Sequence, residues 1–267
     1  MVQLGLHKGG IKLLTNGTKK IAKGKVYICG SGPGNPKLIT IRCHELIKKC
    51  DIILYDRLVS NEILKLIPEK TIRLYVGRSS GDPTSNQIKT NKMMLKYARD
   101  GKKVLRLKGG DPFIFGRGGE EAEFLFENSI RFEIVPGISS AIASAIYSGI
   151  PLTHRKLSSS VAIVTGHEDP TKEEKSVRWD KLAKSVDTIV ILMGIENLPK
   201  IMGKLIHHGL DKDTKVAIIE RGTLQDQKII IGNASNIIEK MKESSIKPPA
   251  VILIGEVVSL SEKIRWR

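Results

Sequence analysis

The chain has 267 residues, of which 40% are hydrophobic and only 4% are aromatic. The hydrophobic fraction is sufficient for a buried core, which argues against global disorder, and the scarcity of aromatic rings argues against a base-stacking platform for single-stranded nucleic acid. The formal net charge of +16 indicates either an acidic partner, such as nucleic acid, an anionic membrane or a polyanionic small substrate, or a solvated lysine surface.

The three cysteines, Cys29, Cys43 and Cys50, cannot all pair with one another, and they form no CxxC motif. We therefore expect a cytoplasmic protein without a disulfide framework. No apolar run reaches the roughly 18 residues of a membrane-spanning helix. Residues 1–24 have no continuous apolar segment of the kind that signal peptides carry. We predict no membrane association and interpret residues 1–24 as a basic N-terminal extension.

In the first half of the chain, short apolar runs alternate with stretches of helical spacing, which predicts repeated strand–helix units. The predicted strands are 25–29, 51–55, 71–76, 104–107 and 132–135, and the predicted helices are 38–49, 60–66, 87–100, 120–127 and 141–147. Five strands that alternate with helices indicate a mainly parallel α/β domain, which we place at residues 25–150.

The loop after the first predicted strand is similar, at first sight, to a dinucleotide-binding turn, and Asp56 stands where a ribose-binding acid would lie. The dinucleotide fingerprint G-x-G-x-x-G requires a third glycine for helix–strand packing. This chain has Asn35 at that place, and Pro33 and Pro36 stiffen the loop. We therefore expect no nicotinamide-dinucleotide site here.

Residues 104–121 form the most informative stretch, a predicted strand that runs into a loop with five glycines and an Asp-Pro pair. Gly109 and Gly110 allow positive φ and a close approach of a ligand to the backbone. Glu120 and Glu121 then stand in the first turn of a predicted helix, where acidic residues are favourable. A strand, such a loop and a helix are the usual layout of an α/β binding site at the carboxyl end of a sheet. The alternative is a tight surface turn.

The second half restarts after residues 149–155 and the serine run 158–160, which we interpret as a domain junction. The predicted elements there are strands at 161–165, 188–193, 216–220, 228–231 and 250–255, and helices at 198–208 and 235–242, with a charged exposed loop at 166–178. These elements predict a C-terminal α/β domain at residues 151–267.

Five motifs occur in order along the chain, at residues 30–36, 55–60, 106–121, 135–138 and 149–155. Together they resemble the tetrapyrrole methylase family, over about residues 25–260. The Tyr-Asp-Arg-Leu-Val-Ser motif at 55–60 and the long Gly-Arg loop resemble the branch of this family that methylates uroporphyrinogen III.

The resemblance implies two α/β domains with an active-site cleft between them, the architecture of class III methyltransferases, usually as a homodimer. It implies methyl transfer from S-adenosyl-L-methionine to C2 and C7 of uroporphyrinogen III, which gives precorrin-2 for sirohaem and cobalamin-type cofactors. S-adenosyl-L-homocysteine would be the second product. By motif position, the cofactor-binding residues would be Pro33, Gly109, Gly110, Asp111, Ile114, Ser139, Ser140, Met193 and Gly222. The carboxylate of Asp111 could accept hydrogen bonds from the ribose or the amino-acid part of the cofactor.

Two catalytic positions follow from the same resemblance, Asp56 and Arg78. Asp56 matches the position of a general base, which would take up the proton that the tetrapyrrole loses on methylation. The alternative is a structural cap or an ion pair with Arg57. Arg78 stands where the family usually has a lysine assigned as a proton donor. Because arginine stays protonated, we expect Arg78 to bind a substrate carboxylate instead.

The basic balance agrees with a substrate that carries eight carboxylates, because a cationic site would speed the encounter and bind the acidic arms. Arg57, Arg117 and Arg155 are the candidate substrate-binding residues, each with a surface ion pair as the alternative. The histidines lack metal-ligand spacing, so we predict no metal. Another corrin-pathway methylase or the diphthine-forming enzyme would not be expected to carry Asp56-Arg57 together with the Phe-Gly-Arg-Gly-Gly sequence at 115–119. A nucleic-acid-binding protein would need a recognition motif that is absent here.

Overall fold

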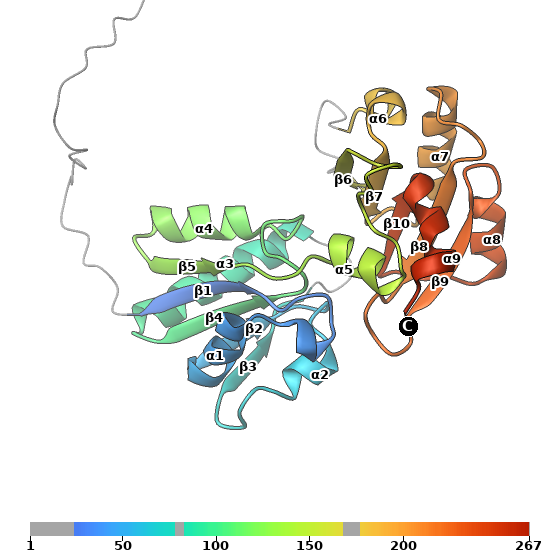
Figure 1. Ribbon diagram of the computed structural model, residues 1–267. Helices are drawn as coiled ribbons and strands as arrows, with labels where there is room; N and C mark the ends of the chain where they lie inside the picture. Colours follow the sequence, from blue (N-terminus) through green and yellow to red (C-terminus); the bar gives the residue numbers. More distant parts are fainter. Residues whose placement is uncertain (1–23, 78–82, 168–176, 267) are drawn as a thin grey trace, which may run out of the picture.

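The computed structural model describes residues 24–77, 83–167 and 177–266, and of residues 83–85 only the backbone. The predicted N-terminal extension, apart from Gly24, and the candidate residue Arg78 therefore lie outside the described residues. Figure 1 shows the described chain as two lobes, each built on one sheet, with a short helix between them.

The first lobe contains a five-stranded sheet in which every pair of neighbouring strands is parallel, as the alternation of strands and helices predicted. Its strand order is β3 (Ile72–Tyr75), β2 (Ile52–Tyr55), β4 (Lys103–Lys108), β1 (Lys25–Gly30) and β5 (Arg131–Val135). Strands β4 and β1 lie at the centre and are buried on both faces, which explains their short, nearly continuous apolar runs.

Helices cover both faces of this sheet: α1 (Ile41–Lys49), α2 (Asn61–Leu64), α3 (Pro83–Arg99) and α4 (Gly118–Glu127). The apolar residues of α1 and α2 pack on one face, and those of α3 and α4 pack on the other. Helix α1 begins at Ile41, three residues later than predicted, because Thr40 caps it by accepting a hydrogen bond from the backbone N–H of Cys43. Residues Pro36–Leu38 form a separate 3₁₀ turn.

The second lobe contains a mixed sheet in which β6 and β7 are parallel and the other neighbours are antiparallel. Its strand order is β6 (Val161–Thr165), β7 (Thr188–Leu192), β10 (Ala250–Ile254), β8 (Lys215–Glu220) and β9 (Lys228–Asn233). Helices α6 (Trp179–Ser185), α7 (Leu198–His207) and α8 (Ile237–Glu243) pack on one face. The 3₁₀ helix η2 (Glu256–Leu260) and helix α9 (Ser261–Ile264) follow β10.

Helix α6 was not predicted, because a charged sequence surrounds its two buried residues, Trp179 and Ala183, which are one helical turn apart. The charged segment 166–178 was predicted as an exposed loop, and most of it, residues 168–176, lies outside the described residues. No helix in the described ranges is long and apolar enough to cross a membrane.

Helix α5 (Ser140–Tyr147) connects the two lobes. It follows β5 of the first sheet, but Ala141 and Ala145 pack with Val190 and Val251 in the core of the second sheet. Small residues at helical spacing let the helix approach the strands closely, which explains the alanine and serine content of this segment. Figure 1 shows α5 between the two lobes.

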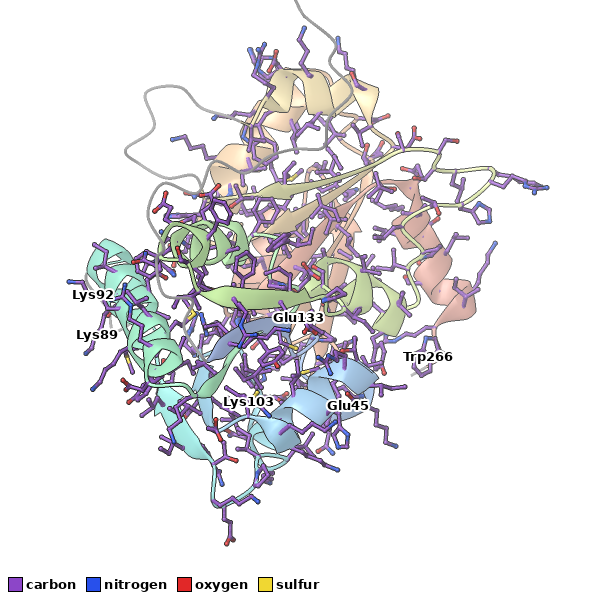
Figure 2. All side chains as sticks on the ribbon, turned by 90° about the vertical axis from the view of Figure 1, so that its left-hand side faces the viewer. Glu45, Lys89, Lys92, Lys103, Glu133 and Trp266 are labelled. Atoms are coloured by element: carbon purple, nitrogen blue, oxygen red, sulfur yellow. The ribbon has the colours of Figure 1, made fainter. Side chains whose placement is uncertain are left out.

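An ionic cluster on the surface joins the edge strand β5 to β1 and α1. Lys25 Nζ lies 2.7 Å from Glu133 Oε2, and Arg42 Nε donates to Glu133 Oε1 at 2.9 Å. Figure 2 labels Glu133 and, on α1, Glu45, which also pairs with Arg42 at 3.1 Å. The hydrogen bond from Lys25, assisted by Arg42, lowers the pKa of Glu133 below its ordinary value of 4.5.

This lowered pKa predicts a pH-dependent contribution to stability. A carboxyl group whose pKa is lower in the folded chain stabilises it above about pH 4.5, and the contribution disappears as the pH falls through the folded-state value. Urea denaturation should show Glu133→Gln less stable than wild type by about 1 kcal/mol or less at pH 7. The difference should shrink as the pH falls below 4.5 and the Glu133 carboxyl group becomes protonated. A difference that does not change with pH would contradict the ionic explanation.

Candidate active site

The predicted site residues lie where strands end, and backbone contacts between glycines hold three of the loops together. Gly32 and Gly110, which follow β1 and β4, exchange two hydrogen bonds, with N···O distances of 3.1 and 2.7 Å. A Cβ atom on Gly137, after β5, would collide with the carbonyl oxygen of Gly110. Three loops from neighbouring parallel strands therefore meet backbone to backbone at the carboxyl edge of the first sheet.

Asp111 fastens two of these loops. Its Oδ1 accepts a hydrogen bond from the backbone N–H of Phe113 at 2.8 Å, and its Oδ2 accepts one from the N–H of Gly137 at 3.0 Å. Both carboxylate oxygens are thus already engaged with the protein backbone, each with one further lone pair available. Asp111 therefore has a structural role that the sequence did not reveal, in addition to the cofactor contact that we predicted for it.

The candidate base Asp56 stands directly after β2, and each of its two carboxylate oxygens contacts a different residue. Its Oδ1 accepts a hydrogen bond from the backbone N–H of Leu58 at 3.1 Å, and Arg106 Nη2 lies 3.3 Å from its Oδ2. The alternative of an ion pair with Arg57 is wrong, because the partner of Asp56 is Arg106 on the neighbouring strand β4. The Asp56 side chain remains 23% exposed, so it is accessible from solvent.

Behind Asp56 lies a set of buried charges. Glu121, on α4, is completely buried and receives Arg106 Nε at 3.0 Å and Lys108 Nζ at 3.1 Å. Gln87 Nε2, from α3, also donates to Glu121 Oε1 at 3.2 Å. Burial alone would raise the pKa of Glu121, but the charges of Arg106 and Lys108 outweigh it and hold this pKa below its ordinary value. Burial lowers the pKa of Lys108, and Arg106 reinforces that effect.

The positions proposed for cofactor binding on the first sheet lie close together. A Cβ on Gly109 would meet Leu58 Cβ at 2.5 Å, so the loop after β2 packs against the loop after β4. At Gly110, φ is +67°, and a Cβ there would point toward Ser139 and Ser140, with Ser140 N at 3.7 Å. Ser139 caps α5 by accepting a hydrogen bond from Ala141 N.

Two of the candidate positions carry exposed apolar side chains. Ile114 is 39% exposed, and Met193, immediately after β7, is 53% exposed and has a φ of +56°. A positive φ is unfavourable for a residue with a side chain and marks a position whose conformation the surroundings enforce. Such residues are available to contact the apolar part of a ligand.

The second lobe contributes a loop that reaches the first. A Cβ on Gly222, after β8, would collide with Ser144 on α5, and a Cβ on Gly34 would lie 2.8 Å from Leu224. Pro33, in the same loop as Gly34, is half-buried. The candidate residues Pro33 and Gly222 therefore belong to segments that approach each other across the two lobes.

The candidate substrate-binding arginines differ in their contacts. Arg117 Nε donates to Glu120 Oε2 at 2.9 Å, so Arg117 has an ion-pair partner one helical turn along. Arg57 and Arg155 are exposed, and among the described residues no hydrogen bond or ion pair joins either one to the other candidate site residues. Arg78 lies outside the described residues, so its predicted role stays a prediction.

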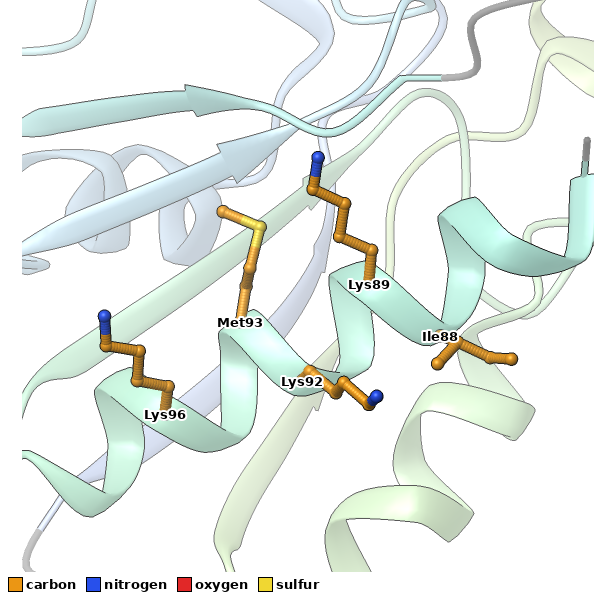
Figure 3. Close-up of a pocket in the computed structure, with 5 residues that line it drawn as sticks. All are labelled: Ile88, Lys89, Lys92, Met93 and Lys96. Carbon is orange, nitrogen blue, oxygen red and sulfur yellow. The ribbon is translucent and has the colours of Figure 1, made fainter.

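Open hollows occur elsewhere on the surface. One of about 370 Å³ lies on the outer face of α3 and is lined by Ile88, Lys89, Lys92, Met93 and Lys96. Figure 3 shows Lys89 and Lys96 on either side of Met93, while Lys92 projects from the helix on the side of Ile88. The hollow contains none of the predicted site residues, and we interpret it as a solvated basic face. Within the described ranges, His, Cys, Asp and Glu side chains do not gather in threes as a metal site would require.

The fold and the site together define a two-lobed α/β enzyme whose candidate site lies at the carboxyl ends of parallel strands. The model of the tetrapyrrole (corrin/porphyrin) methylases matches residues 25–238. The chain belongs to this family, as the five sequence motifs indicated.

Several characterised proteins are similar to the chain over most of its length. An S-adenosyl-L-methionine-dependent uroporphyrinogen III methyltransferase of Methanosarcina barkeri is 48% identical, over 90% of this chain and 94% of the relative. A siroheme synthase of Pseudoalteromonas atlantica is 47% identical over 91% of this chain, and the chain spans about half, 52%, of that relative's length. A crystal structure of uroporphyrin-III C-methyl transferase from Thermus thermophilus, complexed with S-adenyl homocysteine, has a TM-score of 0.77 at 34% identity and covers 89% of this chain and 100% of that one.

Sequence reasoning missed the buried charges behind Asp56. Arg106 lies in the strand that we predicted at residues 104–107 and Lys108 follows it directly, and because the two stand two residues apart in β4, both side chains point to the same face. Buried cations require a buried partner of opposite charge. That rule would have pointed to Glu121, which we interpreted only as an acidic residue at a helix N-terminus.

The glycine contacts predict a sharp difference between two Gly→Ala substitutions. Gly137→Ala places a methyl group against backbone atoms of Gly110 and Gly30, and should destabilise the chain by about 1–3 kcal/mol. Gly203→Ala adds a methyl group in open space on helix α7 and should stabilise it by about 0.5–1 kcal/mol. Urea denaturation of the two variants checks this, and equal stabilities would refute the close packing of the loops.

Proposed function

We propose that this chain transfers methyl groups from S-adenosyl-L-methionine to C2 and C7 of uroporphyrinogen III and so forms precorrin-2, for sirohaem or cobalamin-type cofactors. The observation that carries the proposal is the position of Asp56: a partly exposed carboxylate, held by Arg106, beside the loop that contains Gly109 and Asp111. The names of the relatives from Methanosarcina barkeri and Thermus thermophilus support the substrate and the cofactor.

The residues at the carboxyl edge of the first sheet fit such a cofactor. The space in front of Gly110 faces the first residues of α5, where backbone N–H groups favour a carboxylate. Asp111 has lone pairs left for a hydroxyl or ammonium group, and Ile114 and Met193 offer apolar surface for a ring. When bound, S-adenosyl-L-methionine supplies a methyl group activated by its positively charged sulfur.

The chain would contribute alignment and a proton acceptor. Methyl transfer is an in-line displacement, so holding donor and acceptor in one geometry supplies much of the rate. The methylated carbon is bonded to four carbon atoms and carries no proton, so the cationic tetrapyrrole becomes neutral by losing a proton from another of its atoms, and Asp56 Oδ2 or Oδ1 would accept it. Arg106 keeps this carboxylate at the end of β2, where the substrate would lie beside the glycine-rich loop. These assignments of Asp56 and of the cofactor-binding residues are proposals.

The substrate would be held mainly by charge. Its eight carboxylates are opposite in sign to the chain's net charge of +16. We propose that they bind Arg57, Arg78, Arg117 and Arg155. Arg117 would then exchange or share its present partner, Glu120, with a substrate carboxylate. No role for nucleic acid, membrane or metal is included in the proposal.

We further propose a homodimer in the cytoplasm, with the domains divided near residue 150. An exposed apolar strip on α5 supports the dimer: Ile142 is 42% exposed and Ile146 is 49% exposed. Trp266, which is 61% exposed, packs edge-on against Tyr147 beside this strip. The three free cysteines, all buried, support a reducing compartment.

The proposal predicts a product and a loss of activity in one variant. Incubation of the chain with uroporphyrinogen III and S-adenosyl-L-methionine should give a tetrapyrrole heavier by two methyl groups, detected by mass spectrometry. Asp56→Asn should lower kcat by about 10²–10⁴-fold, because the amide cannot accept the proton. The exposed Asp100→Asn should keep wild-type activity. Normal cofactor binding without any methylated product would rule the proposed function out.

A separate prediction concerns Asp111. Asp111→Ala should weaken cofactor binding, measured by calorimetry with S-adenosyl-L-homocysteine, by about tenfold or more, because the substitution removes a hydrogen-bonding group and releases the loop around Gly137. Circular dichroism should show an intact fold. An unchanged affinity would exclude Asp111 from the cofactor site.

A further inference from the structure

Four charged groups form a continuous chain from the interior to the candidate site. Glu121 is 0% exposed, and the side chains of Lys108 and Arg106 are 4% and 6% exposed. Asp56, at 23%, is the member that reaches solvent. Two cations and two anions balance, so the group has no net charge, which is the arrangement that makes buried charges tolerable.

Arg106 is the link between the interior and Asp56, and each of its three guanidinium nitrogens donates a hydrogen bond. Nε donates to Glu121 at 3.0 Å, Nη1 donates to the carbonyl oxygen of Leu107 at 3.1 Å, and Nη2 donates to Asp56 at 3.3 Å. Because the guanidinium is planar and rigid, fixing Nε and Nη1 also fixes the direction in which Nη2 points. The orientation of Arg106 toward Asp56 therefore depends on Glu121.

Glu121 is itself held from three sides. Lys108 Nζ lies 3.1 Å from both carboxylate oxygens, and Gln87 Nε2 donates to Oε1 at 3.2 Å. Gln87 is fixed in turn by a hydrogen bond to Asn91 at 3.0 Å. Strand β4 and helices α3 and α4 thus converge on one carboxylate, which leaves it little freedom to move.

We propose that Glu121 is a positioning residue for the methyl transfer: through Arg106 it sets the orientation of the Asp56 carboxylate. This inference rests on the proposed function, since it assigns the group that aligns the proposed base. Glu121 does not touch the substrate or the cofactor in this assignment. Arg106 carries one positive charge but contacts two carboxylates, Asp56 and Glu121. Lys108 supplies the second positive charge, and its contact with Glu121 keeps this carboxylate from turning away from Arg106.

The first test compares Glu121→Gln with Glu123→Gln, an exposed position on the same helix. Glu121→Gln keeps the side-chain shape but loses the charged acceptor. Its kcat should fall about 10²-fold, the effect of a misaligned catalytic group. Its KM for uroporphyrinogen III and its affinity for S-adenosyl-L-homocysteine should change less than about threefold. Glu123→Gln should match wild type. Normal kcat in Glu121→Gln would overturn the inference.

A double variant separates positioning from a purely structural role. Lys108→Met combined with Glu121→Gln removes one charge of each sign and restores neutrality, so its Tm should recover toward that of wild type. Its kcat should stay low, because Arg106 still lacks its anchor. Recovery of kcat together with Tm would overturn the inference. If Glu121→Gln does not fold, Glu121→Asp is the substitute variant, because it retains the charge but withdraws the carboxylate from Arg106. This variant should lose at least about tenfold in kcat with little change in Tm. Wild-type kcat in Glu121→Asp would overturn the inference.

A readout without turnover distinguishes this inference from the proposed function. In ¹⁵N-labelled protein, the Nε–H resonance of Arg106 should be resolved and protected from exchange in wild type and in Glu123→Gln, and should broaden or exchange rapidly in Glu121→Gln. An unchanged Arg106 resonance would overturn the inference. If wild type shows the protected resonance but never methylates uroporphyrinogen III, the proposed function fails while the anchoring of Arg106 by Glu121 stands.

Discussion

The burial of the Glu121 carboxylate between Arg106 and Lys108 is the constraint on which the architecture of the site depends. Removing one partner of a buried pair of this kind costs about 3–5 kcal/mol, because the other charge stays in the interior. A partly exposed pair such as that of Lys25 and Glu133 contributes about 1 kcal/mol or less. Because of this difference, a shift of β4 relative to α4 would disrupt the buried ion pairs at a large cost in free energy. Breaking the surface ion pairs around Glu133 would cost little.

The glycine contacts complete this framework at the edge where the strands end. Gly30, Gly110 and Gly137 bring three loops so close that no side chain fits between them. Buried charges therefore align the end of β2 with β4, and close backbone packing aligns the loops of β1, β4 and β5. A methyl transfer depends on alignment more than on strong acids or bases. A site built from rigid backbone and a fixed guanidinium suits that chemistry.

The sequence was sufficient to predict the parallel sheet of the first lobe, the loops that carry candidate residues, and the family. Apolar runs and glycine positions are local signals, and they report strands and turns directly. The ion pair with Arg57 that we gave as an alternative for Asp56 does not form, because adjacency in the chain says nothing about which strand lies alongside; β4 brings Arg106 there. Glu121 does stand in the first turn of α4, but its buried ion pairs were missed because burial is a property of the packed helix. Helix α6 was missed because its buried residues, Trp179 and Ala183, are few within a charged sequence.

We propose that one space, between the loop of Gly109–Asp111 and the Asp56–Arg106 pair, receives both methyl donor and tetrapyrrole. A crystal structure of the chain with S-adenosyl-L-homocysteine tests this most directly. The ligand should lie against Gly110 and the first residues of α5, with its sulfur facing the space beside Asp56 and with Arg106 still bound to Glu121. A ligand bound elsewhere, for example in the lysine-lined hollow on α3, or an Asp56 turned away from the bound ligand, would contradict it.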